Sequence, residues 1–268
     1  MAIAVLAYHS QDIGGNDYHV NDHVALEEDV RRIAASGLPV VSAVSVASAI
    51  AARSPLPERA VVLTCDDGAM LDFADCEVPG HGVQKGFYRI VRESGIAPRA
   101  GRMTSFVIAD PKARATLERT CLDGAQWLGE DWWPRAIVDG SWHLGVHSWD
   151  HHHPTLARYA GLPPAVAEFR GVDSYAEADR QVSVAARYLR ARAANPGDRL
   201  FAYPYGNWTD YLAGDYFPHH ADEHGMIAAF TTEPEFVHAG SNRWRLPRFV
   251  CRLHWRSPEE LAAILRRL

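Results

Sequence analysis

Short apolar segments with the character of β-strands alternate with helix-like segments along the whole chain. Residues 60–64 (Ala-Val-Val-Leu-Thr) show the uninterrupted, β-branched pattern of a strand that is buried on both faces. Such alternation over one continuous length predicts an α/β fold, either a parallel barrel or a doubly wound sheet. We expect strands over residues 3–7, 60–64, 103–108, 142–146, 200–202, 228–231 and 244–246, with a further strand starting at residue 40.

Several of the helix-like segments carry recognisable ends. Acidic residues open the segment 26–35 and Gly37 follows it, as expected at a helix start and stop. Ser42 or Ser45 opens the next segment, and Ser257 stands as N-cap before Pro258. We expect helices over residues 26–35, 44–52, 83–94, 113–121, 175–194 and 258–268, and a long loop over 69–82, where no periodicity is evident.

Composition excludes several classes of protein. Hydrophobic residues make up 47% and charged residues 22% of the 268, which is ordinary for a globular protein and argues against disorder. The net charge of −6 gives no electrostatic reason to expect nucleic acid or an anionic membrane as a partner. No apolar run reaches the roughly 18 residues that span a bilayer. Residues 1–10 are typical of a first strand rather than a signal peptide, and the four cysteines lack CxxC spacing, so we expect a cytoplasmic protein with reduced thiols.

Polar motifs follow three of the predicted strands. In α/β barrels the loops after the strands gather on one face and build the site. Asp66, Asp67, His147 and Tyr205 can therefore converge although they lie far apart in the sequence.

The first motif is Thr64-Cys65-Asp66-Asp67-Gly68. Two adjacent carboxylates after a buried strand are electrostatically costly unless a cation or a proton neutralises them. Successive side chains leaving a strand point in different directions, so one can bind a metal ion while its neighbour faces an attacking water. Taken alone, the motif could equally be a solvated turn at Gly68.

The second motif is the histidine-rich stretch 147–153. His147 and His151 are spaced as on one helical turn, so they can present their imidazoles to one ion. We predict these two as metal ligands, with His153 as the alternative to His151. Asp150 or a remaining histidine could support a ligand from behind. A surface loop is the other interpretation.

The third motif, residues 201–206 (Phe-Ala-Tyr-Pro-Tyr-Gly), is a strand that runs into a Pro/Gly turn. Beside a metal, a rigid turn of this kind could aim a backbone N–H at a developing oxyanion. Hydrolytic zinc sites commonly hold the ion with three N/O ligands and leave a position for water. One Asp and two His supply that set, and the spare Asp is a ready general base, so the combination indicates a hydrolase.

Together the three motifs resemble those of the polysaccharide deacetylases, carbohydrate esterase family four. The resemblance implies a distorted (β/α) barrel of seven or eight strands, a single catalytic domain over residues 1–268, and a divalent metal, most simply Zn²⁺. Thr64-Cys65-Asp66-Asp67 is similar to the family's Thr-Phe-Asp-Asp motif, which implies Asp66 as catalytic base and Asp67 as metal ligand.

The same resemblance assigns further roles. His147-Ser148-x-x-His151 looks like the family's second motif, which implies both histidines as metal ligands. Residues 201–206 are similar to the family's Arg-x-Pro-Tyr-Gly motif, which implies that Tyr205 contributes its backbone N–H to the oxyanion hole. Residues 6–9 (Leu-Ala-Tyr-His) also resemble the Tyr-His found after the first strand in a subset of the family.

The chain departs from the family pattern at two places. Ala202 stands where the family has the Arg that holds the base, so a nearby Arg or His must orient Asp66 instead. The Leu-x-His motif that supplies the general acid is not cleanly present. His254, in Leu253-His254, is the nearest candidate, with a structural or surface role as the alternative, and His9 is a further polar neighbour of the site.

Four residues are predicted to line the substrate pocket. Trp149 and Trp208 flank the motifs and could stack on sugar rings, and His9 and Pro204 complete this set. The loop 69–82 follows the Asp pair directly, so we expect it to shape the pocket as well.

These observations predict a metal-dependent hydrolase that removes an acetyl group, most simply N-acetyl, from a sugar-containing substrate. A deformylase or cyclic-amide hydrolase on the same barrel is a second interpretation, because it would share the metal chemistry. A sugar-binding pseudoenzyme is a third, because Ala202 replaces an Arg and the acid motif is incomplete. The expected partner is a carbohydrate or another acetylated small molecule.

Overall fold

The computed structural model describes residues 1–96 and 102–268. In this part of the chain, seven strands form the main sheet: β1 (Ala2–Tyr8), β2 (Arg59–Cys65), β5 (Met103–Val107), β6 (Trp142–Val146), β7 (Leu200–Ala202), β8 (Ala228–Phe230) and β9 (Phe249–Val250). They pair in parallel in the order β8-β7-β6-β5-β2-β1-β9, as a curled half-barrel. The predicted α/β barrel of seven or eight strands is confirmed, with seven.

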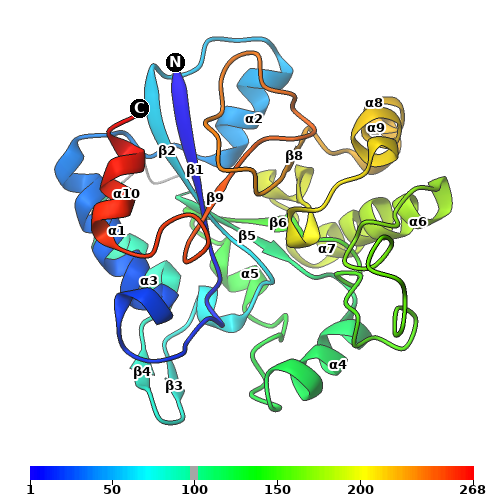
Figure 1. Ribbon diagram of the computed structural model, residues 1–268, viewed down its shortest axis with the longest axis horizontal. Helices are drawn as coiled ribbons and strands as arrows, with labels where there is room; N and C mark the ends of the chain where they lie inside the picture. Colours follow the sequence, from blue (N-terminus) through cyan, green and yellow to red (C-terminus); the bar gives the residue numbers. More distant parts are fainter. Residues whose placement is uncertain (97–101) are drawn as a thin grey trace.

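The helices surround the strands (Figure 1). They are α1 (Asp22–Ser36), α2 (Ala43–Ala51), α3 (Phe87–Glu93), α4 (Pro111–Cys121), α5 (Trp133–Ala136), α6 (Tyr175–Asp179), α7 (Ala185–Ala193), α8 (Phe217–His219), α9 (Ala221–His224) and α10 (Pro258–Leu265). A separate antiparallel hairpin joins β3 (Cys76–Val78) to β4 (Gly82–Gln84).

The strands are buried on both faces, which explains their uninterrupted apolar sequences. Alternate residues of β1 belong to different hydrophobic clusters: Leu6 and Tyr8 belong to the cluster that includes residues of α1, α3, α7 and α10, whereas Ile3 and Val5 belong to the cluster that includes residues of α2. Inside, Gly145 of β6 makes room for Phe106, whose ring carbon would lie 2.5 Å from an added Cβ. The core therefore has two layers, one on each face of the sheet.

Most of the sequence signals at helix ends are confirmed, but the start expected at residue 26 was wrong. The helix α1 begins at Asp22, with Asn21 as its N-cap, so the acidic residues 27–29 lie inside it. Ser42 caps α2 by accepting a hydrogen bond from the Ser45 backbone N–H, and Ser257 caps α10 in the same way. Gly37 ends α1 in the left-handed region, at φ 69°. These ends are local hydrogen-bonding problems, so a short stretch of sequence is enough to specify them.

The interpretation of residues 69–94 was partly wrong. The expected loop contains a 3₁₀ turn at Met70–Asp72 and strand β3, and the expected helix over 83–94 begins only at Phe87 because residues 82–84 form β4. Strands of three residues are too short for alternation to reveal them. Gly86 then passes so close to the backbone of Phe73 that a Cβ there would lie 2.8 Å from it.

Three other segments also differ from the prediction. The strand expected to start at residue 40 is reduced to a single bridge between Val40 and Val61. The helix expected over 175–194 is interrupted by a π-helical segment, Arg180–Val184, which separates α6 from α7. The strand expected over 244–246 is reduced to a single bridge between Leu246 and Phe230, and the edge strand is β9 instead. Apolar runs of two or three residues do not distinguish a strand from an extended loop.

Asp29 is a buried carboxyl of α1 that connects three segments of the fold. Its oxygens accept hydrogen bonds from the hydroxyls of Tyr18 (2.5 Å) and Tyr8 (2.9 Å) and from the indole N–H of Trp255 (3.2 Å). Burial raises the pKa of Asp29 to about 7, although the three donors act in the opposite direction. The network ties β1 and α1 to the segment before α10.

Asp29→Asn is expected to flatten the pH dependence of stability. A pKa near 7 in the folded state lies above the ordinary value of 3.8, so the folded protein keeps a proton here that the unfolded chain releases. This group therefore lowers the free energy of unfolding by ~1.4 kcal/mol for each pH unit between about 4 and 7. Its stabilising contribution is complete below that window and lost above it. Urea unfolding across the window measures the slope, with the exposed Asp131→Asn change as control; parallel slopes for parent and Asp29→Asn would refute the assignment.

Among the residues that the structure describes, no helix combines the length and the apolar character required to cross a bilayer.

Candidate active site

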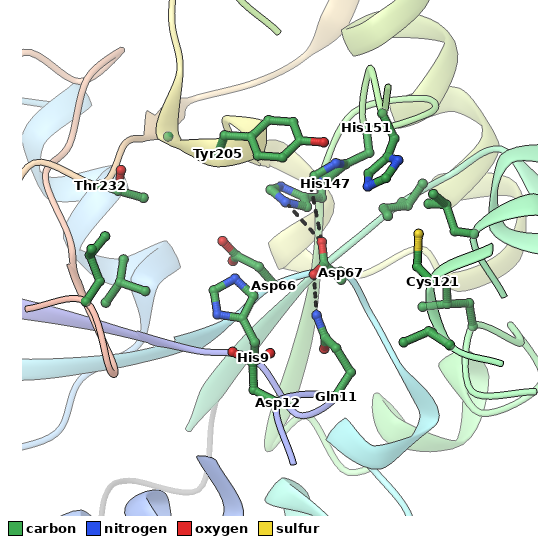
Figure 2. A pocket seen from close by; sticks show the side chains of 18 residues that line it. His9, Gln11, Asp12, Asp66, Asp67, Cys121, His147, His151, Tyr205 and Thr232 are labelled. Carbon is green, nitrogen blue, oxygen red and sulfur yellow. Dashed lines mark hydrogen bonds and ion pairs between the residues drawn. The ribbon is translucent and has the colours of Figure 1, made fainter. Parts of the chain in front are cut away.

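A cavity of about 390 Å³ opens beyond the carboxyl ends of β2 and β6. Side chains from all three sequence motifs line it, among them Asp66, Asp67, His147, His151 and Tyr205 (Figure 2). This is the edge of a parallel sheet at which α/β proteins commonly bind their ligands. The convergence expected from the positions of the motifs after their strands is therefore found in the folded chain.

Asp67, His147 and His151 form a compact cluster of possible metal ligands. Asp67 Oδ1 lies 3.5 Å from His147 Nε2 and 3.4 Å from His151 Nε2, and the three ligand atoms all lie within 4.8 Å of one another. The second carboxylate oxygen of Asp67 accepts a hydrogen bond from the Gln11 amide. His153 also lines the cavity but stands outside this cluster, and its Nδ1 bonds the Thr155 hydroxyl instead.

Local backbone geometry, not a helix, brings the ligands together. Residues 147–153 follow β6 as a loop, in which Ser148 and His151 adopt positive φ angles of 64° and 61°. The two histidines therefore lie on a loop, and the helical turn that we expected from their spacing was wrong. On the other side, Asp67 has φ 73°, and Gly68 passes so close to Val107 that a Cβ would lie 2.6 Å from its methyl carbon. Only glycine fits there, and this turn aims Asp67 at the histidines.

The protonation pattern of the cluster fits a cation. Nδ1 of His147 lies 2.8 Å from the Ala202 carbonyl oxygen, which can only accept, so this nitrogen carries the proton and Nε2 offers a lone pair. Burial, and then the neighbouring His147 and His153, lower the pKa of His151 well below its usual range, which keeps that imidazole neutral. Lone pairs that face a carboxylate this closely repel unless a cation lies among them, and a neutral imidazole is the form that binds metal.

A buried aspartate network supports the histidine loop from behind. Asp150 accepts hydrogen bonds from the His152 backbone N–H (3.1 Å), the Tyr159 hydroxyl (2.8 Å), Arg180 (2.8 Å) and Gln181 (2.9 Å). Arg180 and Gln181 belong to the π-helical segment between α6 and α7. The interruption of that helix thus supplies the side chains that hold the loop.

Asp66 is held by an arginine that sequence reasoning did not identify. Both guanidinium NH₂ groups of Arg248 lie 2.7 Å from the Asp66 carboxylate oxygens, a bidentate pair in which the arginine side chain is fully buried. Burial disfavours the ionised carboxylate, but Arg248 and His147 outweigh it and hold the pKa of Asp66 below its usual range. The expectation that a nearby Arg or His replaces the arginine missing at residue 202 is thus met by Arg248, one residue before β9. No sequence signal marks it.

His9 leaves β1 into the same cavity, beside Asp66 and Asp12 (Figure 2). Burial lowers the pKa of His9, but the charges of Asp67, Asp66 and Asp12 outweigh burial, so that the net shift is upward. Tyr205 has φ 58°, and its ring packs edge-on against His151 at 4.5 Å. Pro204 is buried in the same turn and is not among the residues that line the cavity, so its predicted place in the pocket lining was wrong.

Three other predicted residues are not brought to this cavity. Trp149 packs edge-on against Tyr188, and the Nδ1 of His254 accepts the Val250 backbone N–H at 2.8 Å. Trp208 lines an adjoining groove, where its indole bonds Glu233 at 2.9 Å. Among the described residues that line the main cavity, none comes from 69–82, so that segment does not shape its surface directly.

Comparison with solved structures supports the same fold. The chain superposes on IcaB from Ammonifex degensii with a TM-score of 0.67 and 18% identity, covering 99% of this chain and 97% of that one. The de-N-acetylase from Aggregatibacter actinomycetemcomitans matches with 0.65 and 18%, over 98% and 100%. The Streptococcus pyogenes deacetylase PplD, solved in complex with acetate, matches with 0.64 and 18%, over 99% and 98%. At these identities the likeness concerns the fold alone.

No curated protein matches the chain. A sequence profile described as polysaccharide deacetylase matches residues 53–216, which is more than half of the chain and includes all three motifs but neither His9 nor Arg248. The chain therefore belongs to the polysaccharide deacetylase family.

Proposed function

We propose that this protein is a metal-dependent hydrolase that removes an acyl group, most simply N-acetyl, from a sugar-containing substrate. The observation that carries the proposal is the pairing, in one cavity, of the Asp67–His147–His151 cluster with a carboxylate, Asp66, that Arg248 holds ionised. Family membership supports a sugar substrate and a deacetylase reaction. We also propose that residues 1–268 act as one catalytic domain, and cytoplasmic localisation remains a prediction.

Asp67, His147 and His151 would hold the ion, and their donor set of one carboxylate oxygen and two imidazole nitrogens suits Zn²⁺. A bound divalent ion would supply Lewis-acid polarisation of the acyl oxygen and would lower the pKa of a water molecule. His147 is kept in the ligating tautomer by its bond to the Ala202 carbonyl, and Gln11 orients Asp67. These residues are thus already arranged to bind an ion.

Asp66 takes the proton from the attacking water as general base. Arg248 fixes the direction of its carboxylate and keeps it ionised, and the backbone N–H of Tyr205 is proposed to stabilise the oxyanion. For the proton that the leaving amine requires, His9 is a better-placed donor than His254. His9 lines the cavity and carries a raised pKa, whereas the Nδ1 of His254 is used by the Val250 backbone.

The geometry of the site bears on the two alternative functions, the pseudoenzyme and the deformylase or cyclic-amide hydrolase. The pseudoenzyme interpretation rested on Ala202 in place of the family arginine and on the incomplete acid motif. The Arg248–Asp66 pair answers the first ground, because it supplies a guanidinium from elsewhere in the chain. A deformylase or cyclic-amide hydrolase would share every residue of the cluster. Parallel assays with acetylated, formylated and ureide substrates separate it from the sugar deacetylase.

Metal removal is expected to lower acetate release from acetylated amino sugars by about tenfold or more, and Zn²⁺ should restore it. Asp67→Ala should lose both bound metal and turnover, because it removes one of three ligands. Metal content per chain and acetate release are measured together. His153→Ala removes an imidazole from the same cavity but outside the cluster, so it should keep its metal. Unchanged acetate release from metal-free Asp67→Ala protein would overturn the proposal.

A further inference from the structure

One end of the active-site cavity is a continuous apolar surface. We name as the apolar wall the side chains of Ile108, Leu117, Cys121, Leu122 and Leu128, which line the cavity together. Cys121 ends α4 and marks this wall in Figure 2, where it lies on one side of Asp67 while Asp66 and His9 lie on the other. The cavity thus differs in polarity at its two ends, with the metal cluster between them.

The side chains of the apolar wall are held in place by packing within the fold. Leu117 and Leu128 are each only 5% exposed and Ile108 only 2%. They pack with Ala69 and Leu71 in a small hydrophobic cluster of their own, apart from the two main layers of the core. Packing of this kind holds side chains in single positions, so the wall offers a preformed surface to a ligand.

The size of the cavity exceeds what an acetyl group requires. A methyl group is about as large as a water molecule, whose share of liquid volume is ~30 Å³. The cavity measures about 390 Å³. Part of this volume has to hold the sugar, and the rest, beside the apolar wall, would shield from water a hydrocarbon chain longer than a methyl group.

We propose that the acyl group removed at this site is a hydrocarbon chain longer than acetyl, which lies along the apolar wall, while the sugar lies at the polar end with His9 and Gln11. This inference rests on the proposed function. In the reaction the amide C–N bond breaks and the water oxygen bonds to the acyl carbon. One proton of the water passes by way of Asp66 to the leaving nitrogen and the other stays on the carboxyl group, so that a fatty acid and an amino sugar are released.

The test is a series of N-acyl glucosamines with acetyl, butanoyl, hexanoyl and octanoyl chains, assayed with the metal-loaded full-length protein. kcat/KM is expected to rise by about two- to fourfold for each methylene that the wall covers. Acetyl released faster than every longer chain would overturn the inference and leave the proposed function intact.

Three variants with the same substitution test whether the wall is the cause. Leu122→Glu places a charge on the half-buried edge of the apolar wall, and it should lower the ratio of octanoyl to acetyl kcat/KM at least tenfold. Leu162→Glu, at a 38% exposed leucine outside the cavity, controls for folding and charge. Leu253→Glu alters a leucine that lines the cavity but is not part of the apolar wall, and that is 61% exposed. A loss of chain-length preference in Leu253→Glu but not in Leu122→Glu would place the apolar group beside Leu253 instead and refute the assignment.

A binding experiment keeps the inference testable if no sugar is turned over. Acetate, butanoate, hexanoate and octanoate are titrated into the protein by calorimetry, and affinity should rise with chain length in the parent but not in Leu122→Glu. Rising affinity without turnover of any acyl sugar would support the wall and reject the proposed function. Equal affinity for all four acids would refute the wall, whatever the activity.

Discussion

Asp66→Asn is expected to lower kcat for acyl release by about 10²- to 10⁴-fold, the range by which a positioned general base accelerates a reaction. The amide has nearly the same shape as the carboxylate but does not take up the proton of the attacking water. Asp67, His147 and His151 are unchanged in this variant, so bound metal should stay at the parent level. Acetate-release kinetics and metal content, measured on the same sample, check both statements.

The matched control is Asp12→Asn, which removes another carboxylate from the same cavity. If the negative charge of the cavity mattered more than base catalysis, the two variants would lose similar activity. If kcat falls less than tenfold in Asp12→Asn but by the expected amount in Asp66→Asn, the effect belongs to the Asp66 carboxylate, which Arg248 holds in place. Similar losses of kcat in the two variants would instead show that Asp66 is not the general base.

Arg248→Met is expected to cause the second large effect, on stability and on catalysis together. The bidentate pair is buried, with the arginine side chain 0% and the aspartate side chain 5% exposed. Removal of one partner leaves a buried charge without compensation, a change that typically costs about 3–5 kcal/mol in the free energy of unfolding. Urea unfolding measures this cost. The double variant Asp66→Asn/Arg248→Met removes the orphaned charge and should recover part of the loss.

The pH profile of Arg248→Met separates orientation from mere folding. In the parent, Arg248 holds the pKa of Asp66 below its usual range, so the base stays ionised down to low pH and its contribution to stability is lost only as pH falls through that depressed value. Without the guanidinium, burial acts unopposed by it and raises the pKa of Asp66. The acidic limb of the kcat/KM profile should therefore move to higher pH. Arg248→Lys, which keeps the charge but not the fork, should move it less.

An unshifted acidic limb in Arg248→Met, with activity near that of the parent, would mean that the pair serves structure alone. Because the shift is read from the pH at which activity is half-lost, a loss of folded protein that is the same at every pH does not move it. The position of the limb in Arg248→Lys then reports how much of the effect is charge and how much is geometry.

The metal cluster was predictable because its parts are local. Asp66-Asp67-Gly68 and His147 through His151 each follow an apolar strand, and the ends of parallel strands lie at one edge of the sheet. The conformation of the histidine segment was not predictable in the same way. Spacing of four residues suits a helix, but the chain meets the same requirement with positive φ angles at Ser148 and His151, which a sequence pattern does not announce.

The tryptophans illustrate a different failure. Trp149 and Trp208 were expected at the pocket wall because they flank motifs in the sequence. Neighbours along a loop point in several directions, however, and Trp149 turns to Tyr188 while Trp208 faces an adjoining groove. The wall was built instead from α4 and the segment after it, by leucines such as Leu117 and Leu128 that look like ordinary core residues in the sequence.

By itself, the order of residues determined which strands would be buried, where helices such as α2 and α10 would begin, and which side chains could hold a metal, because each of these follows from contacts within a few residues. Only the tertiary structure decided what completes the site. Arg248 reaches Asp66 across 182 positions because β9 pairs with β1, which pairs in turn with β2. Strand pairing over such distances is set by the packing of the whole sheet, and no local pattern encodes it.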